Sequence, residues 1–158
     1  MQKVGGIFAV LVAIVISACT PPDDSFGNSN DGYPDNAVAT ANAADWDTAQ
    51  PLQVELSEFD YEPETLKFRK GQPYALKLTN TGSITHRFVA RGFFRAIAVR
   101  GIVYEDGEAG YPTIEAVSLE PQETKTLYFV PVISGNYDLS CDRPLHATLG
   151  MVGRLLIE

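Results

Sequence analysis

At residues 135–151 the chain reads GNYDLSCDRPLHATLGM, and this stretch decides its fold. The first part alternates along a predicted strand, so that Tyr137, Leu139 and Cys141 share one face. Four residues separate Cys141 from His146, and four more separate His146 from Met151. Three side chains that bind soft or borderline metals therefore lie on one short loop between two predicted strands.

The chain uses these metal-binding residue types sparingly. It has two Cys, two His and two Met in 158 residues, and the copies outside the loop are Cys19, His86 and Met1. Taken singly, a histidine after a turn, a buried thiol or a core methionine is usually structural. Taken together, two imidazoles, one thiolate and one thioether suit one copper ion, whereas zinc rarely takes a thioether.

The sequence around this loop predicts short strands separated by turn residues. Apolar and polar residues alternate over 52–57 and 74–79, and the other predicted strands are 66–68, 114–119, 126–130, 137–141 and about 152–157. His86 follows the turn Asn80-Thr81-Gly82 and begins another strand. About seven or eight strands at this spacing favour an all-β sandwich or barrel.

Two segments depart from the strand pattern. Phe94, Ile97 and Ala98 recur at helical spacing, which predicts a short helix between residues 92 and 102 or an irregular crossing between sheets. Residues 104–112, with two glycines and a proline, are predicted to form a loop.

The spacing Gly135-x-Tyr137-x3-Cys141-x4-His146-x4-Met151, with His86 55 residues before Cys141, resembles the copper-binding signature of the cupredoxins. This is the family of plastocyanin, azurin and pseudoazurin. Phe59-x3-Pro63-x2-Leu66 and Lys70-Gly71 also resemble its opening strands. The resemblance implies an all-β Greek-key β-sandwich of the cupredoxin type over residues 51–158.

The resemblance also implies the roles of the ligands. His86, Cys141 and His146 would be the equatorial ligands of one copper ion, cycling between Cu+ and Cu2+, and Met151 would be the weak axial ligand. Many cupredoxins have Asn after the first histidine where this chain has Arg87, so a side-chain clamp on the ligand loop is missing. Arg143 places a positive charge on that loop, which should raise the reduction potential. Residues 93–111 have no counterpart in the smaller members and could form a partner surface.

Residues 1–18 are predicted to be a signal peptide, because Lys3 precedes an apolar run over 4–16 that is too short to span a bilayer. The run ends in Ile16-Ser17-Ala18-Cys19, which resembles a bacterial lipobox and implies a lipid on Cys19. Ordinary signal cleavage is the alternative. Because Thr20 rather than Asp follows Cys19, the resemblance favours the outer membrane.

Residues 19–50 are poor in large apolar residues and contain six acidic residues but no Lys or Arg, which predicts a flexible acidic tether. The copper domain then spans 51–158, where the formal charge is −3 compared with −8 for the whole chain. Four arginines follow His86, at 87, 91, 95 and 100. They could steer an acidic partner, or they could pair with local carboxylates.

We therefore expect a periplasm-facing, lipid-anchored electron carrier in the bacterial envelope, monomeric, with redox proteins as partners. We expect no enzymatic activity, organic substrate or nucleic acid, because no further histidine is left to build a catalytic copper site. The alternative is a copper storage or delivery protein that uses the same ligands. A third possibility, an interaction module of this fold without a metal, is disfavoured because such a protein would not need all four ligand residues.

Overall fold

The computed structural model describes residues 32–104, 107–109 and 114–158. The predicted signal peptide, the lipidation of Cys19 and the first part of the predicted tether lie outside the described residues. Within these ranges the structure contains no helix with the length and apolar character that a membrane span requires.

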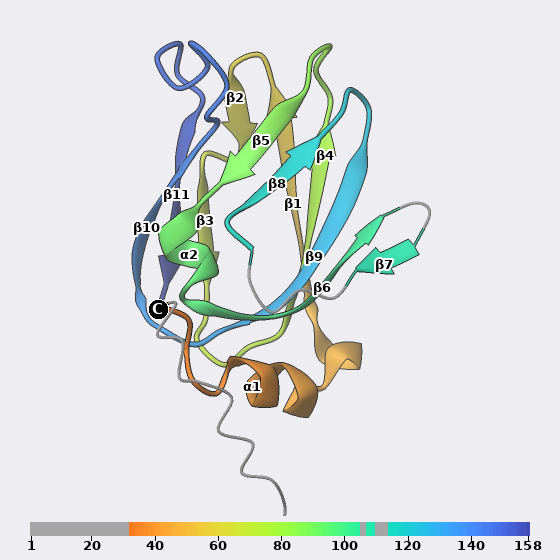
Figure 1. Ribbon diagram of the computed structural model, residues 1–158, viewed down its shortest axis with the longest axis vertical. Helices are drawn as coiled ribbons and strands as arrows, with labels where there is room; N and C mark the ends of the chain where they lie inside the picture. Colours follow the sequence, from red (N-terminus) through yellow and green to blue (C-terminus); the bar gives the residue numbers. More distant parts are fainter. Residues whose placement is uncertain (1–31, 105–106, 110–113) are drawn as a thin grey trace, which may run out of the picture.

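Two packed β-sheets form the fold (Figure 1). One sheet has the strand order β2-β1-β4-β9-β6-β7 and the other has the order β3-β11-β10-β5-β8. The strands of the first sheet are β1 (Gln50–Ser57), β2 (Asp60–Glu62), β4 (Tyr74–Asn80), β6 (Ile97–Tyr104), β7 (Gly107–Ala109) and β9 (Thr124–Pro131). Those of the second are β3 (Thr65–Phe68), β5 (His86–Val89), β8 (Ala116–Leu119), β10 (Gly135–Ser140) and β11 (Val152–Ile157).

Strands that are distant in sequence lie side by side in both sheets. β1 pairs parallel with β4, and β3 pairs parallel with β11, whereas the other pairings are antiparallel. The predicted all-β sandwich is confirmed. The described residues form eleven strands rather than seven or eight, because β2, β6 and β7 were not predicted.

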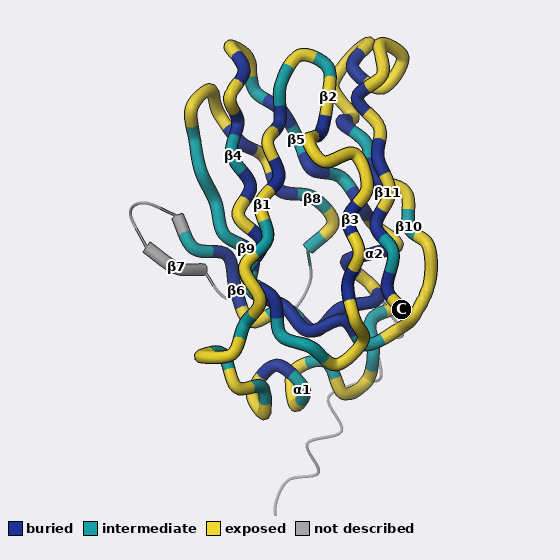
Figure 2. The backbone as a smooth tube through the Cα atoms, turned by 180° about the vertical axis from the view of Figure 1, so that it is seen from behind, coloured by how far each residue is buried: buried dark blue, intermediate teal, exposed yellow. Residues whose placement is uncertain are grey.

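Alternating burial along the strands builds the core between the sheets. In β4, Tyr74, Leu76 and Leu78 are buried and Lys77 is exposed, as the alternation along that strand in Figure 2 shows. At the centre, the rings of Phe68, Phe93 and Phe129 lie with their centroids 5.2–5.4 Å apart. Such pairs add about 0.5–1.5 kcal/mol each beyond their buried area. The core thus ties the two sheets together.

The predicted helix between residues 92 and 102 is shorter than expected. α2 spans only Arg91–Phe94, and Ile97 already begins β6, which pairs with β9. The helical spacing arose because β6 is buried on both faces: Ile97 packs in the core between the sheets and Ala98 packs against Ala41 of α1, while the β-branched residues of this segment favour a strand. The predicted loop over 104–112 is also wrong in part, since β7 pairs with β6 inside it.

The described part of the predicted tether is folded. α1 (Ala37–Ala43) and a 3₁₀ turn, η1 (Trp46–Thr48), precede β1. Ala41 is buried against Ala98 and Val130, and the small alanine side chains let the helix approach the sheet closely. The composition suggested disorder, but alanine is apolar and helix-forming, and the sandwich supplies the surface that α1 packs on. The packing of α1 on the sheet is a tertiary contact, which the composition of the segment alone does not reveal.

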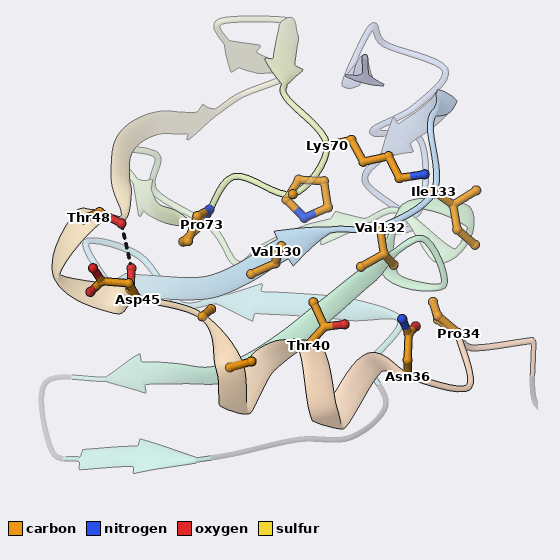
Figure 3. A pocket seen from close by; sticks show the side chains of 14 residues that line it. Pro34, Asn36, Thr40, Asp45, Thr48, Lys70, Pro73, Val130, Val132 and Ile133 are labelled. Atoms are coloured by element: carbon orange, nitrogen blue, oxygen red, sulfur yellow. Dashed lines mark hydrogen bonds between the residues drawn. The ribbon is translucent and has the colours of Figure 1, made fainter.

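α1 lies at the end of the sandwich opposite the loop between β10 and β11 (Figure 1). A cleft separates part of the helix from the strand ends, lined among others by Asn36, Thr40, Lys70 and Val132 (Figure 3). The two ends of the molecule therefore differ in architecture, with a helix at one and the loop between β10 and β11 at the other.

Candidate metal centre

A buried asparagine fixes the turn that leads to His86. The side-chain amide of Asn80 donates to the carbonyl oxygens of Ile84 and Leu119, at 2.8 and 3.0 Å, and its Oδ1 accepts from the N–H of Gly82 at 2.9 Å. Asn80 is fully buried, so these bonds are needed to satisfy its polar atoms. They hold residues 80–84 in one conformation and place His86 at the first position of β5.

The second part of the site is the ligand loop, residues 141–151. The N–H of Cys141 donates to the carbonyl of Met151 at 3.1 Å, and the N–H of Met151 donates to the carbonyl of His146 at 3.0 Å. Gly150 turns the chain with a φ of +116°, a conformation open mainly to glycine. These bonds close the loop on itself and bring His146 back over Cys141.

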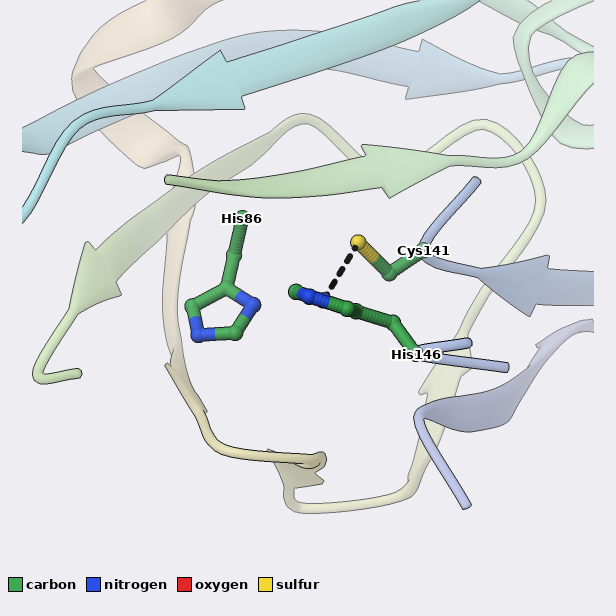
Figure 4. A group of neighbouring side chains, drawn as sticks. All are labelled: His86, Cys141 and His146. Carbon is green, nitrogen blue, oxygen red and sulfur yellow. Dashed lines mark hydrogen bonds between the residues drawn. The ribbon is translucent and has the colours of Figure 1, made fainter. Parts of the chain in front are cut away.

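The structure brings His86, Cys141 and His146 together, as Figure 4 shows. Their ligand atoms all lie within 4.8 Å of one another. The Sγ atom of Cys141 is 3.4 Å from Nδ1 of His146, and the ring centroids of the two histidines are 5.0 Å apart. In Figure 4 one ring nitrogen of His86 is turned toward the other two residues, and the second is turned away.

The three side chains are almost wholly buried, with exposed fractions of 0%, 0% and 6% in chain order. Neither ring nitrogen of His86 has a hydrogen-bond partner. Leaving such a group unsatisfied costs about 1–3 kcal/mol, so its retention needs a reason. A cation held between the three residues supplies one for the ring nitrogen that faces Cys141 and His146.

Electrostatics favours the neutral imidazole that a metal requires. Burial lowers the pKa of His86, and the nearby His146 and Arg143 lower it further, while the carboxylate of Glu58 acts in the opposite direction. A metal ligand must be unprotonated, so this environment prepares His86 for coordination.

The donor set fits copper better than zinc. One thiolate and two imidazoles form the trigonal set of blue-copper centres, whereas structural zinc sites usually have four protein ligands rich in thiolate. Met151 is fully buried, and its backbone bonds to both Cys141 and His146. Its role as an axial ligand stays a prediction.

Two residues near the cluster were not identified from the sequence. Both belong to the turn between β1 and β2: Glu58 Oε1 lies 3.7 Å from His86 Nε2, and the Phe59 ring packs edge-on against His146 with centroids 4.9 Å apart. Neither carries a local sequence signal, since the fold alone brings this turn over the site. Phe59 was noted only as part of an opening strand.

Arg87 has a role that the sequence did not predict. Its guanidinium donates to the carboxylate of Asp142, so the residue after His86 is tied to the residue after Cys141. The expected loss of a clamp on the ligand loop is thus offset by an ion pair. Arg91 and Arg95 both pair with Glu115, which favours the local-pairing interpretation of these arginines over partner steering.

Solved structures that resemble this chain agree on its fold. No family model and no curated protein matches the chain. Reduced auracyanin from the photosynthetic bacterium Roseiflexus castenholzii is similar in structure, with a TM-score of 0.50 and 20% identity over 70% of this chain and 98% of auracyanin.

Two larger proteins share the same fold in part. McoA multicopper oxidase from Aquifex aeolicus superposes with a TM-score of 0.58 and 16% identity, over 73% of this chain and 30% of the oxidase. A copper-containing nitrite reductase from Thermus scotoductus gives 0.55 and 15%, over 69% of this chain and 31% of the reductase. The chain has the cupredoxin fold, and its cluster of His86, Cys141 and His146 fits a single type 1 copper ion.

Proposed function

We propose that the chain is a mononuclear type 1 copper protein that carries single electrons. The observation that supports this most strongly is the buried cluster in which both nitrogens of His86 are unpartnered beside Cys141 and His146. Bound copper supplies a one-electron couple between Cu+ and Cu2+. In this proposal His86, Cys141 and His146 hold the ion and Met151 is the weak axial ligand.

The surrounding residues keep the ligands in place while the charge changes. Asn80 fixes the turn before His86, the backbone bonds of the ligand loop fix Cys141 and His146, and Arg87 links the two segments. Ligands held on rigid elements move little between the two oxidation states. Little rearrangement per electron suits a carrier.

The ligand loop itself exposes an apolar surface. Leu145 and Leu149 are 70% and 56% exposed on either side of His146, which is itself 6% exposed. Large exposed leucines next to a nearly buried ligand suit brief docking of a redox partner protein. Electrons would then pass through His146.

A catalytic role is disfavoured. Both histidines of the chain already belong to the cluster, so none is left for a second copper. A catalytic metal would also need an open position that a substrate could reach, and His86 and Cys141 are fully buried. The Aquifex aeolicus oxidase and the Thermus scotoductus reductase are larger proteins, and this chain covers only 30% and 31% of their lengths.

The test is to load the purified protein with Cu2+, record the visible spectrum and titrate with a reductant. We expect strong thiolate-to-copper absorption that bleaches and recovers reversibly, together with electron exchange between copies. Binding of Cu+ alone, with ready loss of the metal to a competing chelator, would instead indicate copper delivery.

We further propose that Cys19 carries a lipid that anchors the protein to the outer membrane of a bacterial envelope, as a periplasm-facing monomer. The support is the lipobox-like sequence that ends at Cys19. Expression of the full chain and of Cys19→Ser in a bacterial host, followed by membrane fractionation, tests it. The variant should move to the soluble fraction, and retention of both in the membrane would contradict the proposal.

A further inference from the structure

Glu58 is the charged group that faces the outer side of His86. It lies in the turn between β1 and β2, and its Oε1 is 3.7 Å from Nε2, the nitrogen of His86 that is turned away from Cys141 and His146. This separation is longer than a hydrogen bond, and Nε2 has no other partner. The metal-free chain therefore holds a carboxylate close to a buried ring nitrogen that has no hydrogen-bond partner.

The carboxylate is fixed in this position by the turn that precedes β5. Its Oε1 accepts from the N–H of Ser83 at 2.6 Å, from Oγ of Ser83 at 3.0 Å and from the N–H of Ile84 at 3.2 Å. Three donors on one oxygen hold the side chain although it is 32% exposed. A freely rotating surface glutamate would not make such a set of contacts.

Gly82 provides the room for this arrangement. A Cβ atom at Gly82 would lie 2.7 Å from both carboxylate oxygens of Glu58, closer than such atoms approach in proteins. Gly82 is also held by Asn80, which accepts its N–H. The turn that positions His86 therefore also positions the carboxylate of Glu58 beside it.

We propose that Glu58 is a positioning residue for the metal: in the copper-loaded protein it accepts the Nε2–H of His86, fixes the ring with Nδ1 toward the ion, and lowers the reduction potential. Outer carboxylates on metal-bound histidines orient the ring and increase its basicity. A negative charge held near the site favours Cu2+ over Cu+. This inference rests on the proposed copper function and extends it to a residue outside the ligand set.

Glu58→Gln tests the charge while keeping the shape of the side chain and an oxygen for the Ser83 and Ile84 donors. Glu62→Gln is the matched control, because it removes the same charge from the neighbouring strand β2, where Glu62 is exposed. We expect Glu58→Gln to raise the reduction potential and Glu62→Gln to leave it close to that of the wild type.

Gly82→Ala tests the position without removing the charge, because the added methyl group displaces the carboxylate. It should raise the potential in the same direction as Glu58→Gln, and the Cu2+ electron paramagnetic resonance spectrum should shift in both variants. Glu58→Ala, which removes the acceptor altogether, should weaken copper binding about tenfold in a chelator competition.

The outcomes separate this inference from the copper proposal. A wild-type protein that gives no thiolate-to-copper band would refute the proposed function itself. A normal band, with Glu58→Gln and Gly82→Ala both at the wild-type potential, would overturn only the role of Glu58. A merely structural role would lower the unfolding temperature of the metal-free variants without moving the potential, and that result also overturns it.

Discussion

The two ends of the sandwich bury different kinds of groups (Figure 1). At the end that carries the ligand loop, buried polar atoms converge, and both nitrogens of His86 lack a partner. At the other end, α1 buries alanine against the sheet, and the Trp46 indole donates to a carbonyl of the helix at 3.1 Å. At the first end, a bound cation would supply the missing partner of the His86 nitrogen that faces the cluster, whereas at the second end the Trp46 indole N–H finds its partner within the chain.

This contrast shows how burial can be used for function or for stability. Trp46 packs edge-on against Tyr128 at 6.2 Å between ring centroids, and the Arg100 guanidinium lies over both rings at 5.5 and 5.6 Å. These contacts attach the N-terminal segment to the sandwich. Variants at the two ends should therefore change different observables.

The largest effect is expected from Cys141→Ser. Because the thiolate is the donor responsible for the visible charge-transfer band, the copper-loaded variant should lose that band completely. Circular dichroism of the metal-free protein serves as the folding control. A variant that keeps the wild-type spectrum would refute the assignment of the site.

Trp46→Ala removes contacts at the other end of the sandwich, where α1 packs on the sheet. Loss of the partly buried indole and its aromatic contact should lower the free energy of unfolding by about 2 kcal/mol. Denaturant unfolding measures this, and the copper spectrum should stay unchanged. A change in the spectrum would show that the two ends are coupled.

Met151→Leu tests the axial ligand within a fully buried position. The substitution nearly conserves volume, so the stability of the metal-free protein should fall by less than about 1.5 kcal/mol. The band should remain, since the thiolate is intact, but the reduction potential should rise because a donor to Cu2+ is gone. Potentiometry that finds no shift would exclude Met151 from the ligand set.

Leu149→Lys changes only the exposed surface that the ligand loop forms near His146. A like charge on both partners should slow electron self-exchange between copies, on the order of tenfold, without altering the spectrum. Ile133→Lys is the matched control, because Ile133 is 47% exposed and lines the cleft near α1. Equal slowing by the two substitutions would indicate a charge effect with no preferred docking surface.

The smallest effect concerns pH and the metal-free protein. Burial lowers the pKa of His86 in the folded protein below 6.5, the ordinary value that it has in the unfolded chain. Between the folded-state pKa and the unfolded-state pKa, the unfolded chain therefore binds more protons than the folded one. The contribution of neutral His86 to the stability of the folded protein is therefore complete above about pH 6.5, and it falls as the pH drops below that value. Thermal unfolding at pH 7.5 and 5.5 should show a larger loss for the wild type than for His86→Gln, and equal losses would contradict this.

The same contrast separates what could be predicted from what could not. The ligand loop and most strands follow from local patterns, namely the spacing of Cys141, His146 and Met151 and the period-two alternation. β6 was misjudged because Phe94, Ile97 and Ala98 are all buried at helical spacing, although Ile97 packs in the core between the sheets and Ala98 packs against Ala41 of α1. α1 was missed because the surface on which it packs is formed by strands far along the chain.

The sequence by itself determined the donor chemistry, since it offers a single set of scarce residues at one spacing. Tertiary structure decided which groups surround those donors: Glu58 beside His86, Phe59 against His146 and Arg87 paired with Asp142. The physical reason is that ligand identity resides in residue type, whereas orientation and potential depend on neighbours brought close by folding. The two members of these pairs lie 28, 87 and 55 residues apart in the sequence, and no local pattern records such distances.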